Sequence, residues 1–160
     1  MRKKIPRVLL ALGWYEPRVH QGIANYALKA GWHLSADVTK EKVIPWGWEG
    51  EGILAWVGID DNLTRFVLEA KLPTVDFSCR RPELPFPRVL CDHPAAAKLV
   101  AEHFLVRGFK HFMYYSAQDN WAFEENGEAF TSILKQSGCG CNWIRWHKSS
   151  AFTTGHTQWR

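Results

Sequence analysis

Short apolar segments alternate with longer amphipathic segments along most of the chain. The apolar segments are bounded by glycine, proline or charged residues and therefore predict buried strands. These strands cover residues 7–12, 33–38, 52–56, 72–76, 88–91, 109–115 and 142–146. Because helical segments separate most of the strands, the pattern predicts an α/β fold with a parallel sheet and helices on both faces.

The amphipathic segments carry recognisable helix starts and stops. One helix is predicted to begin at Pro17 and to end before Gly31, and a second to follow a cap at Asp61. Two further helices are predicted over 94–107 and 121–137, each followed by glycine. The helix over 94–107 is expected to use one apolar side, formed by Leu99, Val100, His103 and Phe104.

Polar and aromatic residues follow the predicted strands. Ligands of parallel α/β sheets bind beyond the carboxyl ends of the strands, where the strand order reverses. Carboxylates there can accept hydrogen bonds from sugar hydroxyls, and an indole ring can pack against the C–H face of a sugar. The candidate ligand-binding residues are Trp14, Tyr15, Glu16, Arg18, Trp56, Asp76, Asp92, Trp121 and Asn126.

Composition narrows the class of protein. The chain has 160 residues, 46% of them hydrophobic, and a net charge of +4, which is typical of one globular domain or one and a half lobes. The apolar run 8–12 is too short for a membrane span. The four cysteines lack the spacing of a disulfide framework and predict a reducing, cytoplasmic location. Cys139 and Cys141 have no second Cys/His pair at zinc-finger spacing, so no metal site is expected.

The sequence offers little support for catalysis. The segment 13–17 contains one glycine, so it matches no phosphate-binding loop, and the chain has no G-x-S-x-G motif. No catalytic residue and no cofactor are therefore predicted. Two alternatives to a ligand sensor stay open: a small α/β enzyme that uses Asp92 or His93 on a sugar derivative, and a lobe that serves only for dimerisation.

The segment 88–112, RVLCDHPAAAKLVAEHFLVRGFKHF, resembles a conserved stretch of LacI/GalR-type sensor domains. The segments GILA (52–55) and LPTV (72–75) resemble two strands of the same family. The resemblance covers roughly residues 7–146. It implies a periplasmic-binding-protein-like I fold, with residues 1–108 as the N-terminal lobe and 109–160 as the beginning of a second, truncated lobe.

Further positions resemble the xylose-operon regulators of the AraC/XylS family. These are the pattern of Tyr15, Glu16, Val19, Gly22, Ile23 and Tyr26 and that of Trp121, Ala122 and Phe130. This resemblance implies a xylose-like sugar effector bound between two lobes, a homodimer, and DNA binding through a C-terminal domain absent from these residues. No membrane association is expected. The chain departs from the family at Asn126, where an arginine is frequent, and at His93, where asparagine is common.

Overall fold

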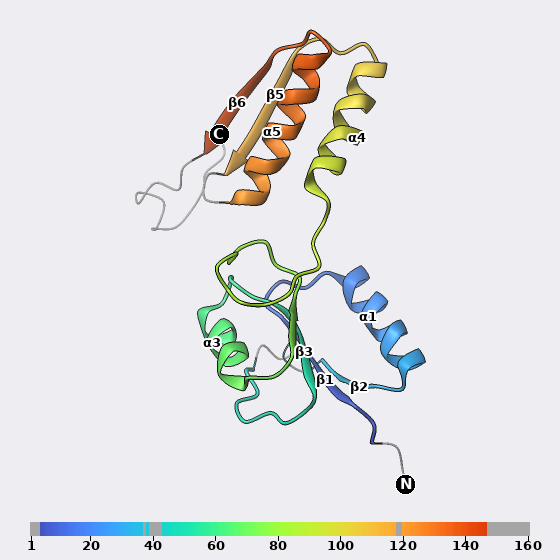
Figure 1. Cartoon of the computed structure of the whole chain (residues 1–160), viewed down its shortest axis with the longest axis vertical. Coiled ribbons are helices and arrows are strands. Elements are labelled where there is room, and N and C mark those ends of the chain that lie inside the picture. Colours follow the sequence, from blue (N-terminus) through green and yellow to red (C-terminus); the bar gives the residue numbers. More distant parts are fainter. Residues whose placement is uncertain (1–3, 37, 39–42, 118–119, 147–160) are drawn as a thin grey trace, which may run out of the picture. The chain divides into compact units, whose positions relative to one another are not determined.

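A computed structural model describes residues 4–36, 38, 43–117 and 120–146 of the chain. The chain forms two compact units, Met1–Leu90 and Cys91–Arg160. Figure 1 labels most of their helices and strands. The last residues of the predicted first lobe, 91–108, belong by their contacts to the second unit. The division into lobes at residue 108 stays a prediction.

The first unit contains a parallel sheet of four strands in the order β2-β1-β3-β4. The strands are β1 (Arg7–Leu12), β2 (His33–Ser35), β3 (Gly52–Trp56) and β4 (Thr74–Asp76). The chain runs from β1 to β2 at one edge of the sheet and later continues from β3 to β4 at the other edge. The strand order therefore reverses between β1 and β3, which places a switch point at their carboxyl ends.

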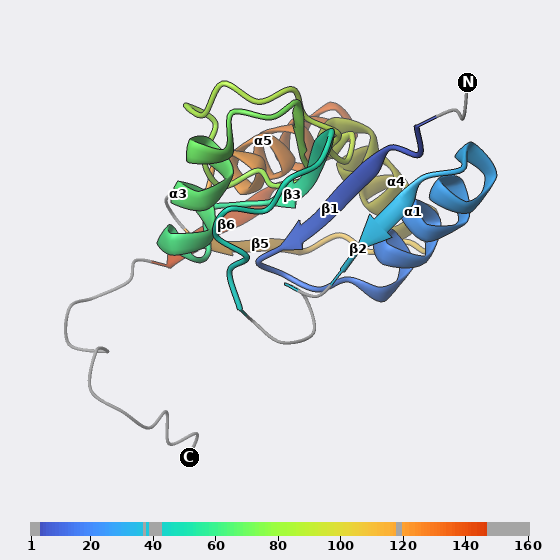
Figure 2. The ribbon, with the colours of Figure 1, turned by 90° about the horizontal axis from the view of Figure 1, so that it is seen from below.

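Two described helices cover this sheet. Helix α1 (Pro17–Ala30) connects β1 to β2, and α3 (Asp61–Ala70) connects β3 to β4. The two connections run in opposite directions, and right-handed crossovers then place their helices on opposite faces. Figure 2 shows α1 and α3 on either side of the strands, so the predicted parallel sheet with helices on both faces is confirmed.

Alternate residues of β1 and β3 form the core under α3. Leu9 and Ile53 are opposite each other in the sheet, and both are buried. They pack with the apolar face of α3, which contributes Leu63, Phe66 and Val67. Alternate side chains of the strands therefore pack against side chains that recur every three to four residues on the helix.

Helix α3 begins differently from the prediction. Asp60, rather than Asp61, is its N-cap, and the Asp60 carboxylate accepts hydrogen bonds from the backbone N–H groups of Asn62 (2.8 Å) and Leu63 (3.3 Å). An N-cap carboxylate satisfies N–H groups two and three residues ahead. Asp61 already lies in the first turn, where its side chain is exposed.

The strand predicted over 88–91 does not form. Arg88 makes only an isolated bridge with Asp76. The Asp76 N–H donates to the carbonyl of Pro87, and its carbonyl accepts from the N–H of Val89, but β4 ends at Asp76 and the pairing with it ends there too. The chain instead enters α4 (His93–Val106).

The second unit pairs two helices with two parallel strands. They are α4, β5 (Phe112–Ala117), α5 (Trp121–Gln136) and β6 (Cys141–Trp146). Strand β5 begins later than predicted. Phe109 lies in the turn after α4, where its N–H donates to the carbonyl of Phe104 and the two rings meet edge to face.

Helix α4 does not use the apolar side predicted for it. Ala97 and Ala101 are its buried residues, and they pack in a cluster with Phe130 and Leu134 of α5. Leu99 is 69% exposed and Val100 48% exposed. Small side chains let two helices approach closely, so the alanine side faces α5 and the larger side chains stay outside.

Candidate functional site

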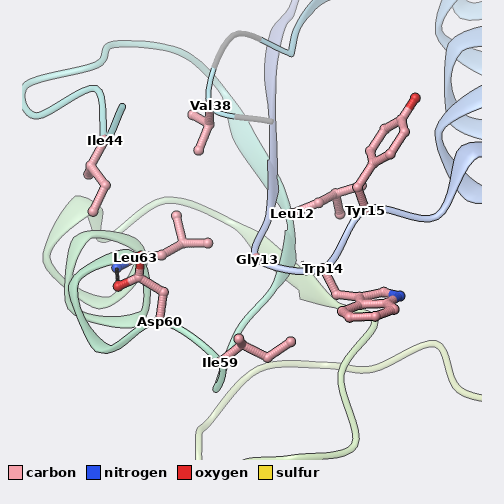
Figure 3. A pocket seen from close by; sticks show the side chains of 9 residues that line it. All are labelled: Leu12, Gly13, Trp14, Tyr15, Val38, Ile44, Ile59, Asp60 and Leu63. Carbon is pink, nitrogen blue, oxygen red and sulfur yellow. Dashed lines mark hydrogen bonds between the residues drawn. The ribbon is translucent and has the colours of Figure 1, made fainter. Parts of the chain in front are cut away.

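A cavity of about 470 Å³ lies at the switch point of the first unit. Its lining comes from the carboxyl end of β1 and the turn after it, from the segment between β2 and β3, and from residues at the start of α3. Figure 3 shows Trp14 and Tyr15 on one side, with Ile44, Asp60 and Leu63 across from them. The full lining is Leu12, Gly13, Trp14, Tyr15, Val38, Ile44, Ile59, Asp60 and Leu63. A cavity of this size and place is typical of small-ligand sites in α/β proteins.

Gly13 opens the cavity at the end of β1. Its N–H donates to the carbonyl of Trp56 at 3.0 Å, which extends the pairing of β1 with β3. A Cβ atom at position 13 would lie only 2.8 Å from that same carbonyl oxygen. Only glycine allows this close approach without a shift of the backbone. The chain then turns away from the sheet and carries Trp14 and Tyr15 to the mouth of the cavity.

Trp14 and Tyr15 are the predicted site residues that this cavity brings together. Their side chains are 59% and 50% exposed, respectively. The Tyr15 hydroxyl is 3.2 Å from Nδ1 of His20, and the two rings meet edge to face. Trp14 therefore offers an open ring face for stacking, while Tyr15 offers a hydroxyl held by a neighbour.

Asp60 is the one carboxylate among the nine lining residues. The sequence pattern predicted a helix cap at the neighbouring Asp61, and Asp60 was not among the predicted site residues. Its position four residues after β3 was the signal that could have found it, because residues after parallel strands gather at one edge of the sheet. A carboxylate there can accept hydrogen bonds from ligand hydroxyls.

Glu16 and Arg18 pair with each other and are not among the lining residues. The Glu16 carboxylate caps α1 by accepting from the backbone N–H of Arg18 (3.2 Å), and it also accepts from the guanidinium Nε (2.9 Å). These hydrogen bonds lower the pKa of Glu16. Both side chains serve the start of α1 in this structure.

Asp76 is fully buried and binds three groups of its own unit. Its Oδ1 accepts from the backbone N–H of Ser78 (2.9 Å) and lies 3.4 Å from that of Val57, and its Oδ2 lies 3.3 Å from Nε of Arg88. Burial raises the pKa of this carboxyl, while the two N–H groups and Arg88 act in the opposite direction. Asp76 thus joins the turn after β3, the turn after β4, and the loop that precedes α4.

Arg88 completes this junction. Its guanidinium donates to the carbonyl oxygens of Arg81, Pro82 and Leu84. The irregular, proline-rich segment 80–87 is therefore tied to the end of β4 through one side chain. Trp56, at the end of β3, is partly buried and is not among the residues that line the cavity.

The second unit places Trp121 and Asn126 together and adds His93 to them. The Asn126 amide nitrogen lies 3.1 Å from His93 Nδ1, and the His93 and Trp121 rings meet edge to face with centroids 5.8 Å apart. His93 was not among the predicted site residues. The signal that could have found it is its departure from the family pattern, in which asparagine is common at this position. Asp92 is exposed and caps α4 by accepting from the backbone N–H of Ala95 at 2.9 Å.

Within the part of the chain that the structure describes, no three His, Cys, Asp or Glu side chains gather as a metal site would require. Cys139 and Cys141 are free thiols. No described helix combines the length and the hydrophobicity that a membrane span needs.

No protein-family model matches the chain, and the search of curated proteins found no match either. Solved structures do share its fold. A sugar-binding transcriptional regulator of the LacI family from Enterococcus faecalis superposes with a TM-score of 0.62 at 15% identity, over 91% of this chain and 57% of that one.

Two further structures carry sugars. The Cra transcriptional dual regulator from Pseudomonas putida, in complex with fructose 1-phosphate, superposes with a TM-score of 0.56 at 13% identity, over 88% of this chain and 58% of its own. A periplasmic binding protein/LacI transcriptional regulator from Alkaliphilus metalliredigens, in complex with D-xylulofuranose, gives 0.52 at 14% identity, over 91% and 58%.

The fold is therefore that of LacI-type, periplasmic-binding-protein-like domains, as the resemblance of the sequence implied. The chain spans less than three fifths of the length of each of these structures.

Proposed function

We propose that the chain is the effector-sensing part of a bacterial transcription regulator and that its effector is a small sugar. The observation that carries this proposal is the cavity at the switch point between β1 and β3, which joins an exposed indole face to a carboxylate. Fold likeness to sugar-responsive regulators supports it as an analogy.

The lining suits the two kinds of surface that a sugar presents. The C–H face of a sugar ring can stack on Trp14, while its hydroxyls can bond to Tyr15 and to the carboxylate of Asp60. The remaining lining is largely aliphatic, which favours a dry contact around these few polar groups. In the second unit we propose Trp121 and Asn126 as ligand contacts, together with His93.

The other predicted contacts bind partners within the chain. Contact with a ligand stays a prediction for these residues, which are Glu16, Arg18, Trp56, Asp76 and Asp92. The narrower assignment to the AraC/XylS type, with a xylose-like effector, is likewise a proposal. A panel of pentoses, pentuloses and hexoses at equal, low concentration in a thermal-shift assay would test the xylose-like effector, because a sugar that binds the folded chain raises the melting temperature above that seen with the other sugars.

Trp14→Ala is the substitution that tests the sensing proposal. Loss of the stacking surface should weaken sugar binding by roughly tenfold to hundredfold, because burying an aromatic face contributes about 1.5–3 kcal/mol. Trp46→Ala is the matched control, since Trp46 is 50% exposed in the same unit but lies outside the cavity. Calorimetric titration of both variants with the sugar found in the screen measures the difference.

Two results would refute the proposal. One is an unchanged affinity in Trp14→Ala while Trp46→Ala loses binding. The other is turnover of the bound sugar derivative, which would favour the small-enzyme alternative over a sensor.

We further propose that the protein acts as a homodimer and that DNA contact uses a part outside these 160 residues. The outer side of α4 supports the dimer, because it leaves Leu99, Val100 and Val106 exposed at 69%, 48% and 86%. Exposed apolar side chains grouped on one element are typical of interfaces. Sedimentation equilibrium should show a dimer that Leu99→Glu combined with Val106→Glu converts to a monomer; a parent chain that stays monomeric at high concentration would contradict it.

A further inference from the structure

A further cavity lies within the second unit, where α4 leads into β5. Its volume is about 160 Å³, and phenylalanine rings form most of its wall. The lining residues are Phe104, Phe109, His111, Phe112, Met113 and Phe130. Small-molecule sites usually measure about 300–1,000 Å³, so this cavity has the size for one apolar side chain rather than for a whole small ligand.

Two of the lining residues are open to a partner. The side chains of Phe109 and Met113 are 51% and 61% exposed. The Phe109 ring meets Phe104 edge to face, which holds it at the cavity. Aromatic residues and methionine are enriched at protein interfaces, and the flexible methionine side chain adapts to the groups that it meets. The apolar part of this surface therefore suits a protein partner.

Cations gather at the same end of the second unit. Figure 1 shows that α4 and α5 end there and that β5 and β6 begin there. The segments 103–113 and 129–142, which form this end, contain no aspartate or glutamate. Their cationic and histidine side chains are those of His103, Arg107, Lys110, His111 and Lys135. The electrostatic complement of this end is an acidic surface.

The chain itself does not neutralise these cations. Glu102, the last acidic residue before this end, pairs with Lys98 at 3.8 Å. Within the described part of the second unit, neither Arg107 nor Lys110 forms an ion pair with a carboxylate. Arg107 donates to the His103 carbonyl at 3.0 Å, which satisfies an acceptor at the end of α4. Lys110 lies beyond the helix and is exposed, so its charge is available to a partner.

We propose that this end of the second unit docks an acidic peptide segment of a partner protein, with one apolar side chain of that segment in the cavity. Lys110 stands between Phe109 and His111, which both line the cavity. Carboxylates that flank the apolar side chain would therefore meet a cation at the rim. The proposal goes beyond sugar sensing and uses no residue of the cavity in the first unit.

Two other occupants match this surface less well. Nucleic acid would meet the cations through its phosphates, but it carries no side chain to fill an apolar cavity. A second copy of the chain, docked through this same end about a twofold axis, would bring the cations of one copy against those of the other. Both occupants are outcomes of the test.

Three labelled peptides test the proposal by fluorescence anisotropy with the 160-residue chain at low salt. DEDDFDDED places one phenylalanine among carboxylates, DEDDSDDED lacks that anchor, and KKKKFKKKK reverses the charge. The first peptide should bind at least tenfold more tightly than either of the others, and its affinity should fall as salt is added. Failure of the first peptide to bind, or equal binding of any two of the three, would overturn the proposal.

Met113→Ala tests the apolar contact. It should weaken binding of the first peptide by about threefold to tenfold, because part of the cavity wall is lost. Tyr115→Ala is the matched control, since Tyr115 is 64% exposed two residues further along β5 but does not line the cavity. Met113→Gln replaces Met113→Ala should circular dichroism show that variant unfolded.

Lys110→Glu tests the charge at the rim. It should weaken binding of the first peptide by about threefold to tenfold at low salt, because an attraction becomes a repulsion. Lys29→Glu is the matched control, since Lys29 is likewise exposed near the end of a helix, α1 of the first unit. Unchanged peptide binding in both Lys110→Glu and Met113→Ala would overturn the proposal.

Two results would assign the surface to a different occupant and so also overturn the proposal. One is tighter binding of a single-stranded oligonucleotide than of the first peptide, with a loss in Lys110→Glu but not in Met113→Ala. The other is a dimer in sedimentation equilibrium that Met113→Ala converts to a monomer.

Discussion

Asp76→Ala should lower the free energy of unfolding of the first unit by about 3 kcal/mol or more at neutral pH. The substitution leaves Arg88, whose side chain is only 18% exposed, without its carboxylate. It also deprives the N–H groups of Ser78 and Val57 of their acceptor. Removal of one partner of a buried pair is costly because the other charge stays buried. Urea unfolding followed by tryptophan fluorescence measures the change.

Asp76→Asn is the informative control. The amide keeps an oxygen for Ser78 and loses only the negative charge, so its cost should be smaller than that of Asp76→Ala. Burial raises the pKa of Asp76 in the folded chain above its ordinary value of about 3.9. The protonated form is therefore favoured by folding.

The stability of the wild type relative to Asp76→Asn should be greatest at a pH below the ordinary pKa of aspartate. It should then decrease as the pH rises through the raised pKa of Asp76 in the folded chain. Paired urea titrations between pH 3 and pH 7 would show the trend. An advantage that grows with pH would mean that Arg88 outweighs burial. Equal stability of Asp76→Ala and the wild type would show that the junction at Arg88 does not hold the fold.

Gly127→Ala should destabilise the second unit by roughly 1–3 kcal/mol, although alanine favours helices. Gly127 is buried in α5, and an added Cβ would lie 2.4 Å from Cζ2 of Trp143 and 2.7 Å from Cε1 of Tyr114. Neither the Trp143 ring nor the Tyr114 ring can move away easily. Trp143 is bonded to Ser116 and covered by Arg145, and it meets Tyr114 edge to face.

Gly22→Ala provides the matched control for this packing argument. Gly22 also lies inside a helix, α1, but an added Cβ there meets nothing within 4 Å. The helix propensity of alanine should then stabilise the chain by about 0.5–1 kcal/mol. Thermal unfolding of the two variants should shift in opposite directions, and a stabilising Gly127→Ala would disprove the close packing of α5 on the strands.

Two of the predicted site residues line the candidate cavity, and their contact with a ligand stays a prediction. Trp14 and Tyr15 follow β1, and the switch-point rule placed them at a cavity mouth without coordinates. The same rule could not show that Asp76 is fully buried and forms an ion pair with Arg88. An aspartate that follows a strand gives the same sequence pattern whether its carboxylate faces solvent or pairs with an arginine far away in the sequence.

Local sequence patterns were sufficient to predict most of the helices and strands in their order along the chain. Apolar runs, caps and glycine stops are local signals, so the strands at 7–12 and 52–56 and the helix from Pro17 to Ala30 appear where they were predicted. The buried side of α4 became apparent from its packing against α5, because that helix carries apolar residues on more than one side. The tertiary structure also decided that residues 88–91 form no strand and that Asp60 reaches the cavity. These outcomes depend on contacts between segments far apart in the chain, and local patterns do not encode which partner a side chain meets.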